Sequence, residues 1–221
     1  MFDRFGSDGS DDAEDYETAR ERMVRTVASR VDDDRVLGAL EAVPRHAFVP
    51  PDRRDSAYED RPLPIGDGQT ISAPHMVAIM ADRLELEPGE DVLEIGTGCG
   101  YHAAVTAEIV GPEHVFSVEY GEDLAEKARD RLAETGYGDV SVRVGDGRDG
   151  WDEHAPYDAA YFTCATAELP EAVVEQVRPG GRLLAPVGSG FQTLVLAEKR
   201  PDGGLERSTH GGVRFVQMRG Q

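Results

Sequence analysis

The sequence predicts an α/β fold with a doubly wound, mostly parallel sheet of seven strands and an N-terminal helical extension. From residue 91 onward, short apolar runs alternate with helical segments, which is typical of βαβ units. The last two apolar runs, residues 191–199 and 213–218, lie on either side of a turn at 201–204, so they predict a terminal antiparallel pair. A length of 221 residues suits one such domain with a terminal extension.

The N-terminal part predicts an acidic tail and two helices. Residues 1–14 are rich in Asp, Ser and Gly and are expected to be disordered. Residues 16–31 predict a helix whose apolar face carries Met23, Val24, Val27 and Val31. Three aspartates at 32–34 can cap a second helix that runs to residue 41 or 42, and Pro44 ends it.

A segment rich in proline and glycine, residues 44–76, is expected to form an ordered functional loop. It carries apolar side chains that should hold it against the body, namely Phe48, Val49, Leu63, Ile65 and Ile71. A third helix should begin near Pro74, with Ser72 or Ala73 at its cap, and should run to residue 84.

We expect residues 15–90 to supply helices and a substrate loop that pack on a ligand-binding core at 91–221. The core elements alternate in chain order, as strand 92–95, helix 102–110, strand 115–119, strand 140–144, strand 157–164, helix 169–177 and strand 182–187. The helix at 169–177 should stop at a turn at 179–181.

Three glycines at alternate positions follow the first strand of the core. A glycine turn lets the backbone approach a ligand closely, because no Cβ intervenes. The dinucleotide fingerprint needs a glycine at position 101, which is Tyr101. The pattern E-x-G-x-G-x-G from Glu94 to Gly100 instead resembles motif I of the S-adenosylmethionine (AdoMet) methyltransferases, in which the turn cradles a methionine and a ribose. A tight strand–helix turn without a ligand is the alternative.

Two acidic residues at strand ends support a cofactor site. Glu119 ends the second core strand about twenty residues after the glycines, where an acid can accept hydrogen bonds from ribose hydroxyls. Asp146 lies between Gly145 and Gly147 after the third strand, where it could bind an adenine amino group. Glu119 could instead be a solvated charge, and Asp146 could simply form a turn with Gly147, as Asp-Gly commonly does.

The charge is strongly negative, with 43 Asp and Glu against 23 Lys and Arg, a formal net charge of −20. Only Lys127 and Lys199 are lysines. This composition indicates a halophile that accumulates salt. At molar salt the Debye length falls to about 3 Å, so the repulsion between the many carboxylates is screened. An acidic mesophilic protein is the alternative. The charge argues against nucleic acid and anionic membranes as partners. Without an apolar stretch of transmembrane length or a signal-peptide pattern, we expect a soluble, cytoplasmic protein.

Two cysteines, Cys99 and Cys164, are too few for a disulfide framework. They are expected to be small, partly buried thiols in a reducing compartment, although a thiol pair close to the cofactor is conceivable. No His/Cys cluster has the spacing of metal ligands, so no metal is expected.

Several motifs together resemble protein-L-isoaspartate O-methyltransferases over residues 20–218. They are PRHAFVP at 44–50, LPIGDGQTISAPHM at 63–76, VLEIGTGCGY at 92–101, GDG at 145–147 and RPGGRL at 178–183. The QTISAPH part is the most specific, because other methyltransferases do not carry it. The resemblance implies a seven-stranded Rossmann-like methyltransferase fold, AdoMet as cofactor, and isoaspartyl proteins and peptides as substrates, which are repaired through a methyl ester and a succinimide. We expect a monomer.

The resemblance also implies roles for particular residues. Ser72 matches the catalytic serine, and Ser72, Val213 and Phe215 match substrate positions. The cofactor positions are Thr70, Ile71, His75, Glu94, Gly96, Thr97, Gly98, Gly100, Glu119, Tyr120, Asp146 and Gly147. Three positions depart from the family pattern, namely Asp67 in place of an aromatic residue, Cys99 in place of serine and Cys164 in place of alanine.

Methyl transfer to a carboxylate needs no strong base, because the carboxylate is already ionised at neutral pH. Ser72 is expected to donate a hydrogen bond to the carboxylate oxygen that does not attack; a helix cap is its alternative role. His75 either contacts the cofactor or only closes the start of the helix. The alternative functions are methyl transfer to another carboxylate or small molecule, and AdoMet binding without turnover.

Overall fold

A computed structural model describes the backbone of residues 9–220 and the side chains from residue 15. Its main sheet has seven strands in the order β5-β4-β3-β6-β7-β8-β9. The first five are mutually parallel, β8 is antiparallel to both its neighbours, and the predicted fold class is confirmed. The strands are β3 (Val92–Ile95), β4 (Val115–Glu119), β5 (Ser141–Val144), β6 (Tyr157–Phe162), β7 (Val177–Val187), β8 (Gln192–Lys199) and β9 (Leu205–Val213).

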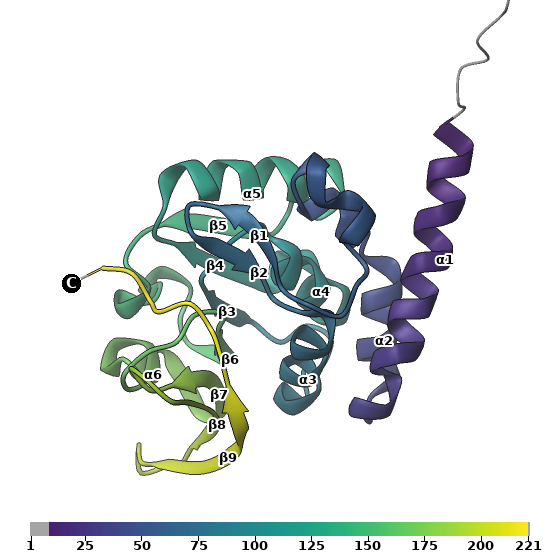
Figure 1. Cartoon of the computed structure of the whole chain (residues 1–221). Helices are drawn as coiled ribbons and strands as arrows, with labels where there is room; N and C mark the ends of the chain where they lie inside the picture. The colour runs from purple at the N-terminus through teal and green to yellow at the C-terminus, as the bar shows by residue number, and fades with distance from the viewer. Residues whose placement is uncertain (1–8, 221) are drawn as a thin grey trace, which may run out of the picture.

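Helices cover both faces of this sheet (Figure 1). The side chains of the central strands alternate between two apolar clusters, so Val92 faces one cluster and Leu93 the other. The first cluster includes residues of α1 (Gly9–Val27), α2 (Asp34–Ala42), α3 (Pro74–Leu84), α4 (Tyr101–Val110) and α5 (Glu122–Glu134). The second includes Trp151 and α6 (Glu171–Gln176).

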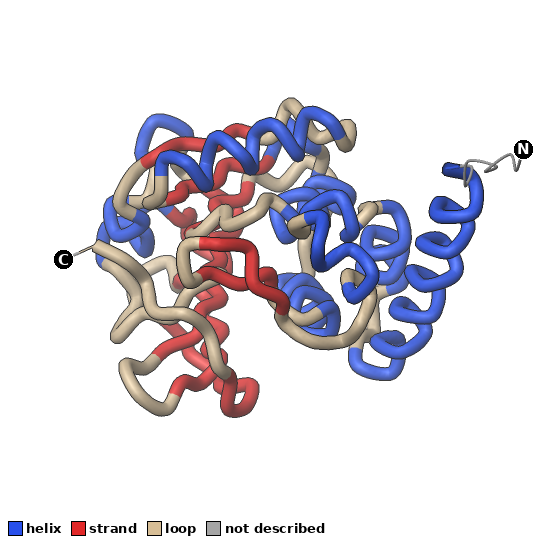
Figure 2. Tube along the Cα trace, turned by 45° about the horizontal axis from the view of Figure 1, so that its top comes forward, coloured by secondary structure: helices blue, strands red, loops and turns tan. Residues whose placement is uncertain are grey.

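A small hairpin, β1 (Leu63–Gly66) and β2 (Gln69–Ile71), lies inside the predicted loop and apart from the main sheet (Figure 2). Asp67 and Gly68 form its tip with φ of 51° and 70°. Positive φ at both central residues is what a tight hairpin turn requires, and Asp-Gly supplies it at low cost. The departure at Asp67 therefore has a structural reason, because an aspartate tolerates this backbone better than most side chains.

Several boundaries differ from those predicted. Helix α1 begins at Gly9 and ends at Val27, so residues 9–14 are helical, while residues 1–8 lie outside the described part. The turn expected at 179–181 is part of β7.

The last strand also differs, because it is Leu205–Val213 and not 213–218. This strand is polar and mostly exposed at the sheet edge, so no hydrophobic pattern marks it. Its place follows from the tight turn that sets Lys199 opposite Leu205.

Candidate active site

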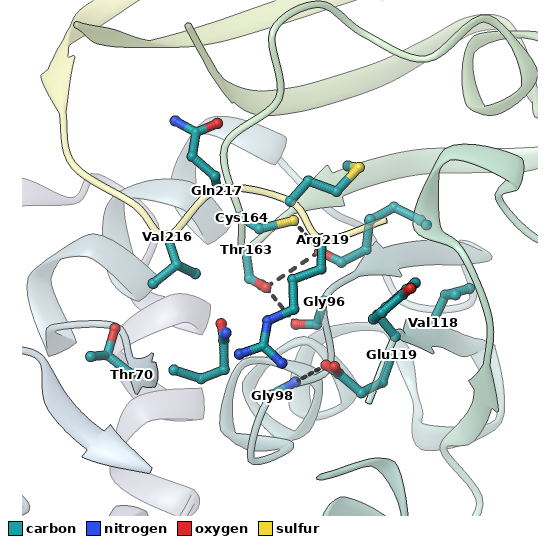
Figure 3. A pocket seen from close by; sticks show the side chains of 15 residues that line it. Thr70, Gly96, Gly98, Val118, Glu119, Thr163, Cys164, Val216, Gln217 and Arg219 are labelled. Atoms are coloured by element: carbon teal, nitrogen blue, oxygen red, sulfur yellow. Dashed lines mark hydrogen bonds between the residues drawn. The ribbon is translucent and has the colours of Figure 1, made fainter. Parts of the chain in front are cut away.

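A cavity opens at the carboxyl ends of β3, β4 and β6, with about 550 Å³ of empty space that is open to solvent (Figure 3). The chain turns in opposite directions from β3 to β4 and to β6, so this is the switch point where ligands bind in doubly wound sheets. The residues lining it include Gly96, Gly98, Glu119, Tyr120 and Gly147, all predicted cofactor positions.

The glycine turn forms the floor of this cavity. Gly96 has φ of 99°, and a Cβ there would collide with the Thr163 hydroxyl. Gly98 has φ of 57° and donates its N–H to the Glu119 carboxylate at 2.9 Å. Gly100 does not line the cavity; a Cβ at this position would press on Leu132 of α5 at 3.1 Å. Two of the three glycines thus serve the cavity, and the third serves helix packing.

Glu119 is buried, with 8 % of its surface exposed, so it is not a solvated charge. Its two carboxylate oxygens accept the N–H groups of Gly98 at 2.9 Å and Gly121 at 3.0 Å. These two bonds fix the orientation of the carboxylate at the cavity wall. Each oxygen can still accept a further hydrogen bond, and this arrangement suits a ligand hydroxyl pair.

Glu94 lies beneath the turn and does not line the cavity. The structure therefore does not support the predicted direct contact between Glu94 and the cofactor. Its fully buried carboxyl accepts hydrogen bonds from Tyr161 at 2.8 Å and from Ser117. Ser117 in turn contacts the Thr97 hydroxyl at 2.6 Å. Burial raises the pKa of Glu94 to about 8. Glu94 therefore supports the glycine turn from below through Ser117 and Thr97.

Asp146 does not line the cavity, and its carboxylate is paired with Arg148. Its carboxylate accepts from the Arg148 guanidinium and from the Arg148 N–H at 3.0 Å. The Arg148 hydrogen bonds lower the pKa of Asp146. Its neighbour Gly147 is the residue that lines the cavity.

Ser72 lies where a groove meets the glycine turn. The groove is lined by Ser72, His75, Val213 and Phe215 among others, and Ser72 also lines a small cavity with Ile71, Gly96, Thr97 and Gly98. Thr70 and Thr163 line all three spaces. Helix α3 has Ala73 as its N-cap and no side-chain cap, so the cap alternative for Ser72 is wrong.

His75 lines the groove and not the cofactor cavity. Its backbone N–H and its Nδ1 both contact Asp60 Oδ1, at 2.9 and 2.7 Å. The aspartate thereby satisfies a free N–H of the first turn of α3. The geometry supports the reading that His75 closes the start of this helix.

The segment 213–219 crosses from the groove to the cofactor cavity. Gln192 is buried, and its amide bonds both the N–H and the C=O of Phe215, at 2.6 and 3.0 Å. The N–H and C=O groups of Phe215 are therefore already paired with Gln192. Further on, Ala165 binds Val216 and Met218 through two backbone hydrogen bonds.

Arg219 lies in the cavity (Figure 3). It donates to the Asp67 carbonyl at the hairpin tip. We call residues 216–219 the strap. The strap, Thr163 and Gln69 line the cavity although the sequence did not predict them there. Thr163 could have been found, because it follows a parallel strand as Gly96 does; nothing in the pattern marks Arg219.

Cys99 and Cys164 are both free thiols. Cys99 lines the small cavity and Cys164 the cofactor cavity. Burial raises the pKa of both thiols, that of Cys164 to about 12. They are therefore protonated, unreactive neighbours of the site at neutral pH.

No group of three or more possible metal ligands occurs within the described residues, and no helix among them could cross a membrane. The sheet order, the glycine turn and the buried strand-end acid define a class I AdoMet-dependent methyltransferase. A family model of protein-L-isoaspartate(D-aspartate) O-methyltransferase matches residues 18–221. The chain belongs to this family, and the predicted enzyme class and cofactor are confirmed.

Comparison with individual proteins leads to the same family. The chain is 50% identical over 209 residues to protein-L-isoaspartate O-methyltransferase 2 of Archaeoglobus fulgidus, covering 94% of this chain and 95% of the relative. A solved protein-L-isoaspartate O-methyltransferase matches 91% of this chain and 66% of its own at 32% identity, with a TM-score of 0.84. A Plasmodium falciparum protein solved with S-adenosyl-L-homocysteine has the same fold, with a TM-score of 0.80, 24% identity and coverage of 92% and 98%.

Proposed function

We propose that the chain transfers the methyl group of AdoMet to the free carboxylate of L-isoaspartyl residues, and that Ser72 holds this carboxylate. The observation that carries the proposal is the position of Ser72, which lines both the groove and the cavity at the glycine turn. The Ser72 hydroxyl forms no hydrogen bond to any described residue and caps no helix, so it is available to a ligand.

The residues of the large cavity fit the cofactor. We assign the ribose hydroxyls to Glu119, whose fixed oxygens retain acceptor capacity. We assign the methionine part to Gly96 and Gly98 of the glycine turn, which line the cavity. When bound, AdoMet supplies a sulfonium methyl group that is open to in-line displacement.

The protein contributes positioning and removal of water. An isoaspartyl carboxylate is ionised at neutral pH, so no residue must remove a proton. A hydrogen bond from Ser72 orients this carboxylate, and the groove residues Val213 and Phe215 hold the peptide beside it. Charge is neutralised as the methyl group moves, so a site that excludes water favours the reaction.

The test is the Ser72→Ala enzyme, with an isoaspartyl peptide and its normal aspartyl twin as substrates. We expect turnover of the isoaspartyl peptide to fall by roughly one to two orders of magnitude, or about 1.4–2.8 kcal/mol. Loss of one oriented donor typically costs about 2.7–4 kcal/mol for a developing oxyanion, and this carboxylate instead loses charge as it attacks. The affinity for AdoMet should not change.

Ser208→Ala, at an exposed position of β9, is the control and should keep normal turnover. Wild-type turnover in a folded Ser72→Ala enzyme would remove Ser72 from the mechanism. Equal methylation of both peptide twins, or a preference for small acids in a substrate panel, would contradict the isoaspartyl substrate.

We also propose that the enzyme is a cytoplasmic monomer in a halophile that accumulates salt, and that it binds no nucleic acid. The net charge of −20 supports the absence of nucleic-acid binding, because it opposes association with polyanions. We further propose that residues 15–90 form the substrate side of the enzyme and 91–221 the cofactor side. Light scattering after size exclusion would test the monomer.

A further inference from the structure

Arg45 is a fully buried guanidinium with no carboxylate beside it. It begins the short helix Arg45–Phe48, and none of its surface is exposed. No described Asp or Glu forms an ion pair with it. Burying a charge without a partner is strongly destabilising, so other interactions must explain its presence.

Its donors are directed at the backbone of the active-site loop. Nε donates to the Ala57 carbonyl and Nη2 to the Ser72 carbonyl, each at 2.7 Å. Its Cζ lies 4.7 Å from the centre of the Tyr101 ring, which begins α4 directly after the glycine turn. One side chain thus joins the substrate loop, Ser72 and the cofactor turn.

Ser72 depends on this contact more than its neighbours do. It lies between the end of β2 at Ile71 and the N-cap of α3 at Ala73. Its carbonyl therefore belongs to neither the hairpin ladder nor the helix, and Arg45 supplies its hydrogen bond. Without that donor, a part-buried carbonyl would be left unpaired and the backbone could rotate.

We infer that Arg45 is a positioning residue for methyl transfer, whose guanidinium fork fixes the Ser72 backbone so that the hydroxyl meets the substrate carboxylate. This inference rests on the proposed role of Ser72. A lysine keeps the charge, but all its donors lie on one nitrogen, so it cannot reach the Ala57 and Ser72 carbonyls from two separate nitrogens as the planar fork does. The fork geometry, and not the charge, is therefore the property that the reaction requires.

The test is a double-mutant cycle with Arg45→Lys and Ser72→Ala, measured at saturating AdoMet well below the melting temperature. We expect Arg45→Lys to lower kcat on an isoaspartyl peptide roughly tenfold, because small misplacements of a catalytic group cost up to about a hundredfold. AdoMet affinity should stay within about twofold. In the Ser72→Ala background the same replacement should change kcat by less than about twofold, because coupled sites are not additive.

Arg182→Lys is the matched control. Arg182 also donates to a backbone carbonyl, that of Glu85 at 2.7 Å, but it lies on β7 outside the groove. The Arg182→Lys enzyme should lose stability and keep its kcat. Arg45→Met, which preserves length without charge, provides a second variant; both Arg45 variants should show similar kcat losses.

Three results would overturn the inference. One is full activity of folded Arg45→Lys, whether or not Arg45→Met loses kcat. Another is an undiminished loss in the Ser72→Ala background, and a third is a kcat loss in Arg45→Met many times larger than that in Arg45→Lys. Failure of the proposed function looks different, because the wild-type enzyme would then not prefer the isoaspartyl peptide, or Ser72→Ala alone would leave turnover unchanged.

Discussion

At the scale of the residue, Glu119 provides the sharpest test of the cofactor site. Replacing it with alanine removes the acceptor for the ribose hydroxyls and leaves the Gly98 N–H without its 2.9 Å partner. We expect AdoMet affinity to fall by about 1.5–3 kcal/mol, the usual value for a hydrogen bond to a charged group. Isothermal titration calorimetry would measure this loss. Glu126→Ala, on the exposed side of α5, should bind AdoMet normally; an equal affinity in both variants would remove Glu119 from the site.

The sequence predicts single residues well where a strand end dictates their place. Gly96, Gly98 and Glu119 follow parallel strands, so their convergence at one sheet edge follows from the fold. Glu94 was predicted to contact the cofactor, but its side chain lies below the turn. Its partners, Ser117 and Tyr161, come from strands distant in sequence, so the sequence does not reveal them. The role of Arg45 could not be predicted although it lies in the PRHAFVP motif, since its partners are two backbone carbonyls distant in sequence.

At the scale of the elements, the buried Glu94 carboxyl links β3, β4 and β6 and should make stability depend on pH. Its pKa is about 8 in the folded chain, against an ordinary value of 4.5. Between these values the unfolded chain has released a proton that the folded chain keeps. The free energy of unfolding therefore falls as the pH rises from about 4.5 to 8, by at most about 1.4 kcal/mol per unit from this group.

Glu94→Gln should remove this pH dependence, because an amide can still accept from Tyr161 and can donate to Ser117. Denaturant unfolding of both proteins at several pH values, at fixed salt, would measure it. The difference between wild type and variant isolates Glu94 from the other carboxylates. Parallel stability curves across this range would show that Glu94 is not protonated in the folded protein.

The elements themselves were predictable where an apolar period marks them, as in β3, β4 and α3. The hairpin β1–β2 was missed although Asp67 and Gly68 carry its signal, because its strands are only four and three residues long. The polar edge strand β9 was missed because pairing geometry and not burial places it there.

At the scale of the whole molecule, the charge of −20 should make stability depend on salt. We expect the melting temperature and activity to rise as KCl increases from about 0.1 M towards molar concentrations, because the Debye length falls from about 10 Å to about 3 Å and self-repulsion is screened. Differential scanning calorimetry across this range would measure the change. A melting temperature that is constant or falls would favour an acidic mesophilic protein instead.

The two lysines are in keeping with a surface of this kind. Lys199 is half-buried and donates to the carbonyls of Val174, Glu175 and Val177 at the end of α6, so it serves the fold. Lys127 alone is an exposed lysine. The solvent-facing surface therefore carries its positive charge almost entirely as arginine.

The path of the strap decides which end of the chain should carry an affinity tag. Residues 216–219 line the cofactor cavity, and Gly220 lies against Tyr120 and Asp146. A tag or surface linker attached behind them would start at the rim of the cavity and would compete with the cofactor for space. Helix α1 instead points away from the sheet at its N-terminal end (Figure 1). Purification handles and immobilised assays should therefore use the N-terminus.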